Sequence, residues 1–236
     1  VPAGVTSFTV TVPTTADTID EANETYTLTV GAASGTGTIN DDDAAPTIQG
    51  VTSATQVEGT ALVHTVTLTN ASSSSTSFAY TLGGGSATSG TDYTNPPTFS
   101  NGVTLVAGNL IVPAGVTSFT VTVPTTLDTI DEGASENYNL SVGGVAATGT
   151  ITDDDNAPSI ASVSSANAVE ATSIVHTVTL SNASSSNTSY TLSLADVSAT
   201  GGGTDYTSTL TNAAFSNGVT LAAGIITVPA GVTSFT

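Results

Sequence analysis

The sequence contains no lysine, arginine, cysteine, methionine or tryptophan. Without cysteine the chain has no disulfide framework, no thiolate metal site and no cysteine nucleophile. Its 19 acidic residues have no Lys or Arg to offset them, so the formal net charge is −19. Nucleic acids and anionic membranes are bound chiefly through Lys and Arg, and we therefore expect neither as a partner. A chain of this charge attracts cations instead.

Other absences narrow the class of protein. There is no run of 18 apolar residues, so we expect no direct membrane insertion of this segment. No Ser or Thr has a recognisable base and orienting acid, and no cation is present to stabilise an oxyanion, so we expect no enzymatic activity. Charged residues make up only 8% of the chain and hydrophobic residues 38%. This composition is that of a chain that buries a core, not of a disordered acidic tail.

The chain repeats itself. The nonapeptide VPAGVTSFT stands at Val1–Thr9, Val112–Thr120 and Val228–Thr236. The triplet Asp41–Asp43 recurs as Asp153–Asp155. A period of roughly 110 residues is too long for a solenoid repeat and is the size of one autonomous domain, so each unit should fold on its own core.

The positions of the repeats predict three segments. Residues 44–155 form one complete unit, residues 1–43 the C-terminal part of a preceding unit, and residues 156–236 the N-terminal part of the next. Two explanations follow. Either the 236 residues are an excerpt of a longer polypeptide, or the partial units of successive subunits complete one another head to tail in a filament by strand exchange.

The local patterns are those of β-strands. Phe119, Val121 and Val123 alternate with hydroxyl residues, and the segment Leu62–Leu68 alternates in the same way. No apolar series with helical spacing is sustained, and Gly and Pro interrupt the chain at short intervals. Several short alternating strands per unit predict an all-β chain of tandem antiparallel β-sandwiches.

Two further features have mainly structural interpretations. His64 and His176 lie on the predicted inward faces, so we expect both to be packed structural histidines. The runs 70–77 and 182–189 have the composition of hairpin tips and are predicted to be loops. Each contains an Asn-x-Ser pattern, and Asn23–Thr25 is an Asn-x-Thr pattern, so these are acceptors for glycans in a glycosylating host.

The order of motifs in the complete unit suggests a family. It contains Val57–Gly59, then Ser86–Tyr93, Val112–Gly115, Asp128–Gly133 and the closing Gly149–Asp155. In that order and at those spacings the unit resembles a Calx-beta domain, an immunoglobulin-like module of sodium/calcium exchangers and long bacterial surface proteins. The resemblance covers the complete unit and both partial ones, and it implies tandem immunoglobulin-like sandwiches.

The resemblance also implies Ca²⁺ as a cofactor, held at one end of the sandwich by acidic residues from several loops. Carboxylates are the oxygen ligands that calcium prefers, and without Lys or Arg only an external cation can neutralise them. In the complete unit the matching residues are Glu58, Asp92, Asp128, Glu132, Asp153, Asp154 and Asp155. In the partial units they are Asp17, Glu21, Asp41, Asp42, Asp43, Glu170 and Asp205.

One departure from the family pattern bears on the number of ions. The family usually has two adjacent aspartates in the long loop, whereas Leu127 precedes Asp128 and Ala16 precedes Asp17. We therefore expect one or two calcium ions per junction. Asp131 or Glu136 is a candidate to replace the missing carboxylate.

The location of the acids predicts a mechanical function. The Asp153–Asp155 triplet ends one unit, and Pro158 introduces the next. We expect a structural segment of an extracellular or cell-surface fibre, stalk or adhesin that is stiffened by calcium at its junctions, with neighbouring repeats of the same or an identical chain as partners. The alternatives are an adhesive module that binds a surface ligand or glycan through its rows of outward threonines, and the strand-exchanged filament.

Overall fold

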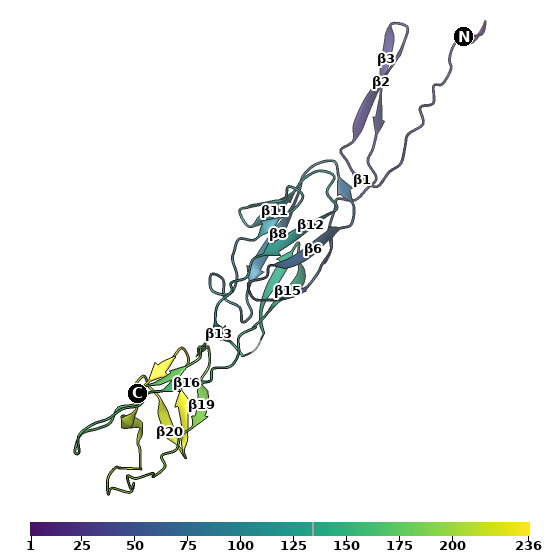
Figure 1. Cartoon of the computed structure of the whole chain (residues 1–236). Helices are drawn as coiled ribbons and strands as arrows, with labels where there is room; N and C mark the ends of the chain where they lie inside the picture. The colour runs from purple at the N-terminus through teal and green to yellow at the C-terminus, as the bar shows by residue number, and fades with distance from the viewer. Residues whose placement is uncertain (134) are drawn as a thin grey trace.

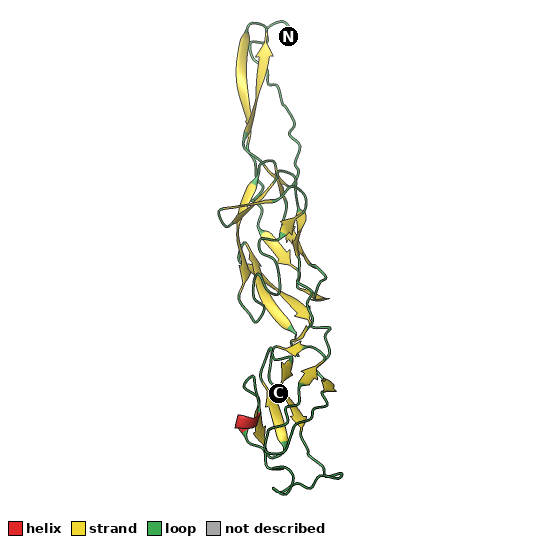
Figure 2. Cartoon of the chain, turned by 60° about the vertical axis from the view of Figure 1, so that its left-hand side comes forward, coloured by secondary structure: helices red, strands yellow, loops and turns green. Residues whose placement is uncertain are grey.

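The computed structural model describes residues 1–133 and 135–236, and they form an elongated row of β-structure (Figure 1). Strands and loops account for nearly all of it. The one helical turn in this part of the chain is the 3-10 helix η1 (Asn212–Ala214) (Figure 2). The prediction of an all-β fold is confirmed. The β-branched residues and frequent glycines favour strands and tight turns over helices.

The complete unit is a two-sheet sandwich. One sheet has the order β10-β11-β8-β14-β15-β5, and the other β4-β6-β12-β9. All neighbouring strands are antiparallel except β5 and β15. The strands of the first sheet are β5 (Ala54–Val57), β8 (Thr76–Gly83), β10 (Thr104–Val106), β11 (Asn109–Val112), β14 (Glu136–Val142) and β15 (Val145–Thr152). Those of the second are β4 (Ile48–Val51), β6 (Leu62–Leu68), β9 (Thr98–Phe99) and β12 (Ser118–Val123).

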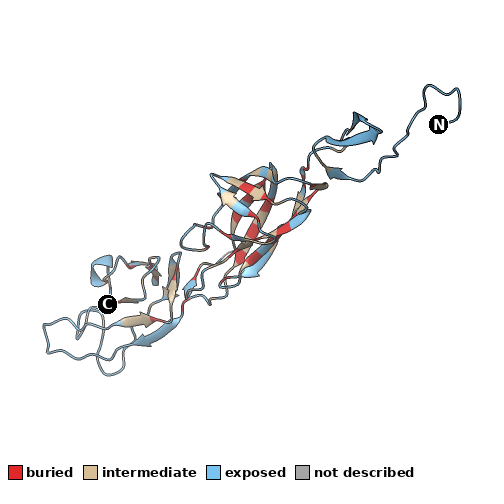
Figure 3. Cartoon of the chain, turned by 90° about the horizontal axis from the view of Figure 1, so that it is seen from above, coloured by how far each residue is buried: buried red, intermediate tan, exposed pale blue. Residues whose placement is uncertain are grey.

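The core lies between these sheets and follows the period-two pattern of the sequence. In β6, Leu62, His64, Val66 and Leu68 are buried, while Val63 and Thr65 face solvent. Buried positions gather in the middle of the row, in the complete unit (Figure 3). The buried side chains of β12 and β14 complete the core. The prediction for His64 is therefore correct.

The third segment is a half-sandwich. Its sheets have the orders β16-β17-β22 and β19-β21-β20, which repeat β4-β6-β12 and β8-β11-β10 of the complete unit. A small core including Leu180, Ile226 and Phe235 joins them. The strands are β16 (Ile160–Val163), β17 (Val178–Leu180), β19 (Thr188–Thr191), β20 (Thr220–Ala222), β21 (Ile225–Val228) and β22 (Ser234–Phe235). His176 is exposed, so its predicted burial is wrong: the segment has no counterpart of β14 to cover it.

The first segment has a single hairpin, β2 (Glu24–Val30) and β3 (Ala33–Ile39). Its side chains are largely exposed, and residues 1–18 contain no strand. Short strands connect the segments. β1 (Ile19–Asp20) pairs in parallel with β7 (Ala71–Ser72), and β13 (Ile130–Asp131) pairs with β18 (Ala183–Ser184).

These junction pairings correct the prediction that runs 70–77 and 182–189 are wholly loops. Each run contains a two-residue strand, β7 or β18, and the first residues of β8 or β19. The composition of the runs is that of a turn, but the backbones of β7 and β18 pair with β1 and β13 of the preceding unit. Such long-range pairing overrides local propensity.

Candidate metal centre

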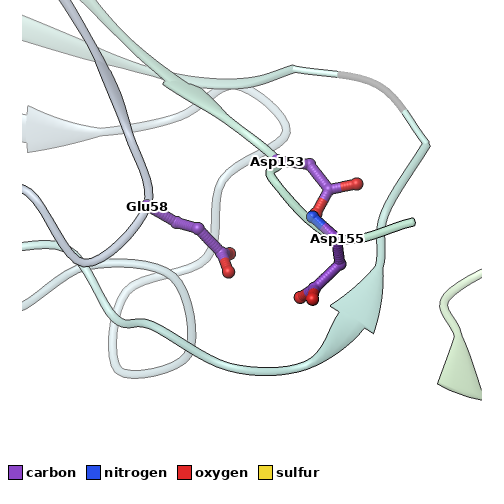
Figure 4. Close-up of side chains that lie close together, drawn as sticks. All are labelled: Glu58, Asp153 and Asp155. Atoms are coloured by element: carbon purple, nitrogen blue, oxygen red, sulfur yellow. The ribbon is translucent and has the colours of Figure 1, made fainter. Parts of the chain in front are cut away.

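Glu58, Asp153 and Asp155 converge at one end of the complete sandwich (Figure 4). One carboxylate oxygen from each lies within 4.8 Å of the others. The parallel pairing of β5 with β15 explains this, because Val57 is opposite Thr152 and the chain leaves both strands at the same edge. Glu58 then follows β5 directly, and Asp153 follows β15. Glu58 is buried, whereas the two aspartates are half-buried.

A second group comprises Asp92, Glu132 and Glu136, whose oxygens also lie within 4.8 Å of one another. Asp92 is held in place by the next residue, Tyr93, which is buried in the core. Glu132 follows β13, and Glu136 begins β14. All three carboxylates are half-buried.

Asp153 connects the two groups through backbone hydrogen bonds. Its Oδ2 accepts from the amides of Glu132, at 3.1 Å, and Gly133, at 3.3 Å. Its Oδ1 accepts from the amide of Asp155 at 3.1 Å. One carboxylate therefore orients both the closing triplet and the long acidic loop.

The electrostatics of the site penalise its own negative charge. Burial, reinforced by neighbouring carboxylates such as Asp92, raises the pKa of Glu132 and that of Glu136 to about 7. The pKa values of Glu58 and Asp155 are raised by the same causes, although the amide of Asp128 partly offsets the shift at Glu58. Since the chain has no Lys or Arg, no side-chain cation relieves this repulsion at neutral pH.

The donor chemistry fits a calcium ion. Among the described residues, Glu136 Oε2 and Asp155 Oδ2 are buried without a hydrogen-bond partner. Buried carboxylate oxygens without partners are costly, and a hard cation with six to eight oxygen ligands satisfies them. One such atom belongs to each group.

The remaining predicted residues of the complete unit lie beside these groups. The amide of Asp128 donates to Glu58 Oε1 at 3.4 Å, and Asp128 Oδ1 accepts from the amide of Ile130 at 2.7 Å. Asp154 is exposed and belongs to neither group. Asp131 and Glu136 were the two candidates to replace the missing carboxylate of the long loop. Glu136 belongs to the second group, whereas the backbone carbonyl of Asp131 accepts a hydrogen bond from the Ser184 hydroxyl of the next segment.

The first segment contains a partial version of this arrangement. Asp17 Oδ1 accepts from the amide of Ile19 at 2.8 Å, as Asp128 does from Ile130. Burial and neighbouring carboxylates raise the pKa values of Glu21 and Asp43. A shallow hollow is lined by the acids Asp17, Glu21, Glu24, Asp41, Asp42 and Asp43. Within the described residues, none of them belongs to a three-carboxylate group.

Glu170 and Asp205 of the third segment are exposed and lie in no such group among the described residues. Asp205 Oδ2 accepts from the amide of Thr200 at 2.8 Å. In the complete unit the carboxylates grouped with Glu58 and Asp92 follow β13 and β15 or begin β14, and residues 156–236 include no counterpart of these strands.

A family model described as the Calx-beta domain matches residues 2–53, 41–155 and 153–230. The chain belongs to the Calx-beta domain family. The three matches show that Calx-beta units are arranged in tandem, and the sandwich described above is their fold. A comparison with curated protein sequences finds no match.

Solved structures of Calx-beta domains are among the similar folds. The crystal structure of CBD12 from CALX1.2 is 16% identical with a TM-score of 0.36, covering 80% of this chain and 73% of that one. The calcium binding domain CBD12 of CALX1.1 is 15% identical with a TM-score of 0.37, covering 81% and 74%. In the described part of this Calx-beta chain, no helix has the length and apolar character needed to cross a membrane.

Proposed function

We propose that these tandem Calx-beta units form a calcium-stiffened spacer in an extracellular or cell-surface protein. The observation that carries this proposal is that one acidic loop takes part both in a carboxylate group and in the junction with the next segment. The loop that supplies Glu132 to the second carboxylate group also supplies Asp131 to the junction with the next segment. Binding or loss of a cation at these carboxylates would therefore act directly on the junction.

The junction is a backbone clasp. Ile130 and Asp131 pair in parallel with Ala183 and Ser184. The Asp131 carbonyl accepts from the Ser184 hydroxyl at 3.0 Å and from the Ser185 amide at 2.9 Å. A second clasp, with Asp20 bound to Ser72 and Ser73, repeats this arrangement at the first junction. Repetition of the same clasp supports a regular array.

Calcium would be held by Glu58, Asp153 and Asp155 and by Asp92, Glu132 and Glu136, and it would neutralise their mutual repulsion. Hydrogen bonds within the site would couple the carboxylates to the junction. Asp153 accepts hydrogen bonds from the amides of Glu132 and Gly133, so it holds the loop that ends in the clasp. Repelling carboxylates would loosen the loop, and neutralised ones would order it.

The proposed units are residues 1–43, 44–155 and 156–236, with their boundaries immediately after the aspartate triplets. This division places the two carboxylate groups of the complete unit beside its junction with the next unit and leaves two residues between triplet and proline, too few to separate the joint from the acids. The close similarity of the repeats favours a spacer over an adhesive module. A ligand-binding face is needed only once, whereas copies of one unit add length. The role proposed for the array is structural and not catalytic.

Calcium titration of the 236-residue chain after chelator treatment tests the proposal, with thermal unfolding and small-angle scattering as readouts. We expect calcium to raise the melting temperature and to narrow the distribution of particle lengths. Magnesium serves as the control, because it demands a smaller octahedral site. Unchanged melting and unchanged scattering with calcium would show that the acids are ordinary solvated loop residues.

A further inference from the structure

The tripeptide Asn182–Ser184 lies at the junction with the preceding unit and has the sequence Asn-Ala-Ser of a glycan acceptor. The side-chain amide of Asn182 uses both its N–H groups and its oxygen. Its Nδ2 donates to the carbonyl of Asn156 at 2.8 Å and to that of Ala183 at 3.1 Å. Its Oδ1 accepts from the hydroxyl of Ser181 at 2.6 Å. A glycan on Nδ2 would replace one of the two N–H donors.

Asn182 holds the linker between the two units. Asn156 is the first residue after the aspartate triplet of the complete unit, and Pro158, two residues further on, is buried. The next amide, that of Ser159, donates to the hydroxyl of Ser181 at 3.0 Å. Two adjacent side chains, Ser181 and Asn182, therefore bind the linker at its first residue and again three residues later.

Ser184 holds the acidic loop of the preceding unit. It is buried, and its hydroxyl donates to the carbonyl of Asp131 at 3.0 Å. Its own carbonyl accepts from the amide of Gly231 at 2.9 Å. Gly231 belongs to the repeated VPAG turn and has a φ of 76°, a conformation that favours glycine. The repeated turn thus anchors the tripeptide in its own unit.

Residues 70–72 make the same contacts with the linker at the first junction. Asn70 Nδ2 donates to the carbonyls of Ala44, at 2.8 Å, and Ala71, at 3.2 Å. Asn70 Oδ1 accepts from the hydroxyl of Thr69 at 2.8 Å. Thr69 takes the place of the serine at the second junction, so the hydroxyl is kept although the residue differs.

Ser72 repeats the contacts of the second serine. Its hydroxyl lies 2.7 Å from the Oδ2 and 3.3 Å from the carbonyl of Asp20, and its own carbonyl accepts from the Gly115 amide at 2.9 Å. The linker contributes backbone carbonyls to the bonds with the asparagines. These bonds are kept although the linker sequence changes from Ala-Ala-Pro-Thr at 44–47 to Asn-Ala-Pro-Ser at 156–159.

We propose that the Asn-Ala-Ser tripeptide is the docking motif through which each unit binds the preceding one. Its asparagine positions the linker, and its serine positions the acidic loop. A linker alone would let the units rotate about its bonds, and two attachments to one short strand remove this freedom. The motif contributes rigidity to the proposed spacer and rests on that function, but its hydrogen bonds need no calcium. The docking accounts for the Asn-x-Ser pattern of both runs without a glycan.

Distances between spin labels on either side of the second junction test the motif in the whole 236-residue chain. The chain has no cysteine of its own, so Thr65→Cys and Thr177→Cys place one label on each unit at exposed, equivalent positions. Double electron–electron resonance gives the distance distribution, in calcium and in chelator. Asn182→Ala is compared with Asn187→Ala, a control whose side-chain oxygen accepts from the amide of Ala230 within its own unit.

We expect Asn182→Ala to broaden the distribution in both solutions, because each hydrogen bond lost raises the undocked fraction about five-fold. Asn182→Asp keeps the acceptor for Ser181 but loses both donors, so it should broaden the distribution as well. Asn187→Ala should leave the width unchanged. An unaltered width in Asn182→Ala, or equal broadening by both alanine variants, would overturn the docking motif whatever their melting temperatures.

The labelled chain without further substitution separates this result from the proposed function. Narrowing of its distribution by calcium is the result expected of calcium-stiffened junctions. If calcium leaves the distribution unchanged while Asn182→Ala broadens it, the docking motif stands and calcium stiffening fails. If calcium narrows the distribution and Asn182→Ala has no effect, the proposed function stands and the docking motif fails.

Discussion

The hydroxyl of Tyr138 lies 2.9 Å from Nε2 of His64, and the bond crosses the core between the two sheets of the complete unit. The other ring nitrogen, Nδ1, lies 2.7 Å from the backbone carbonyl of Thr52, so it carries the proton and donates. Nε2 then accepts from Tyr138. Burial lowers the pKa of His64 and keeps the ring neutral, which suits this arrangement.

Tyr138→Phe should therefore destabilise the complete unit. It leaves the buried Nε2 of His64 without a donor, and we expect a loss of about 1–3 kcal/mol in the free energy of unfolding. Urea denaturation measures the loss. Tyr26→Phe is the matched control, because Tyr26 occupies the same repeat position but is 36% exposed. Equal effects of the two substitutions would show that the core hydrogen bond contributes nothing.

Glu58→Gln should weaken calcium binding by at least about ten-fold, because it removes a buried charged ligand from a three-carboxylate group. Isothermal titration calorimetry on chelator-treated protein measures the affinity. Glu170→Gln is the control at the same repeat position, where the side chain is exposed and belongs to no three-carboxylate group among the described residues. This control should leave the affinity unchanged. Unaltered binding by Glu58→Gln would remove Glu58 from the proposed ligands.

The calcium-free protein should become less stable as the pH rises from about 5 to 8. Glu132 and Glu136 have folded-state pKa values of about 7, above their ordinary value of 4.5. The folded protein therefore holds these protons more tightly than the unfolded chain does, and the resulting stability is lost as the pH rises through 7. Melting temperatures in chelator across this range measure the trend.

Calcium should remove or reverse this pH dependence, because it neutralises the same carboxylates. The double substitution Glu132→Gln with Glu136→Gln should flatten the curve in chelator. A calcium-free melting temperature that increases between pH 5 and 8 would contradict the electrostatic account of the site.

Ser184→Ala should loosen the second junction. It removes one of two hydrogen bonds to the Asp131 carbonyl, at a cost of about 1 kcal/mol, so the Ser185 amide should exchange about five-fold faster. Hydrogen exchange followed by NMR measures the rate. Ser72→Ala makes the corresponding change at the first junction and should leave Ser185 unaffected. An unchanged Ser185 rate in Ser184→Ala would show that the hydroxyl does not support the clasp.

Alternation of side chains along β6 and β12 could be predicted because it is local: a strand presents successive residues to opposite faces. The burial of His64 follows from the same rule, but the exposure of His176 does not. The two histidines have similar sequence neighbours, and only His64 has a β14 to cover it. Burial depends on a partner strand distant in sequence, which a local pattern cannot report.

For the acidic residues, too, the sequence predicted the candidates but not their contacts. The repeats and the family resemblance identified Glu58, Asp92, Glu132 and Asp153 as candidates, but not which carboxylates share a group. The parallel pairing of β5 with β15 brings Glu58 to Asp153 and Asp155 across about 95 residues of chain. The tertiary structure also distinguishes Glu136, which faces the second group, from Asp131, which belongs to the clasp.

The repeat, the β-structure, the Calx-beta resemblance and the lack of any Lys or Arg to balance the acids could all be predicted or counted from the sequence alone. These are properties of composition, spacing and period-two alternation, and none requires a distant contact. How the units join and which acids share a group follow only from the fold. The junction clasps and the two carboxylate groups both depend on strand pairing between distant segments, whose register follows from packing the whole chain.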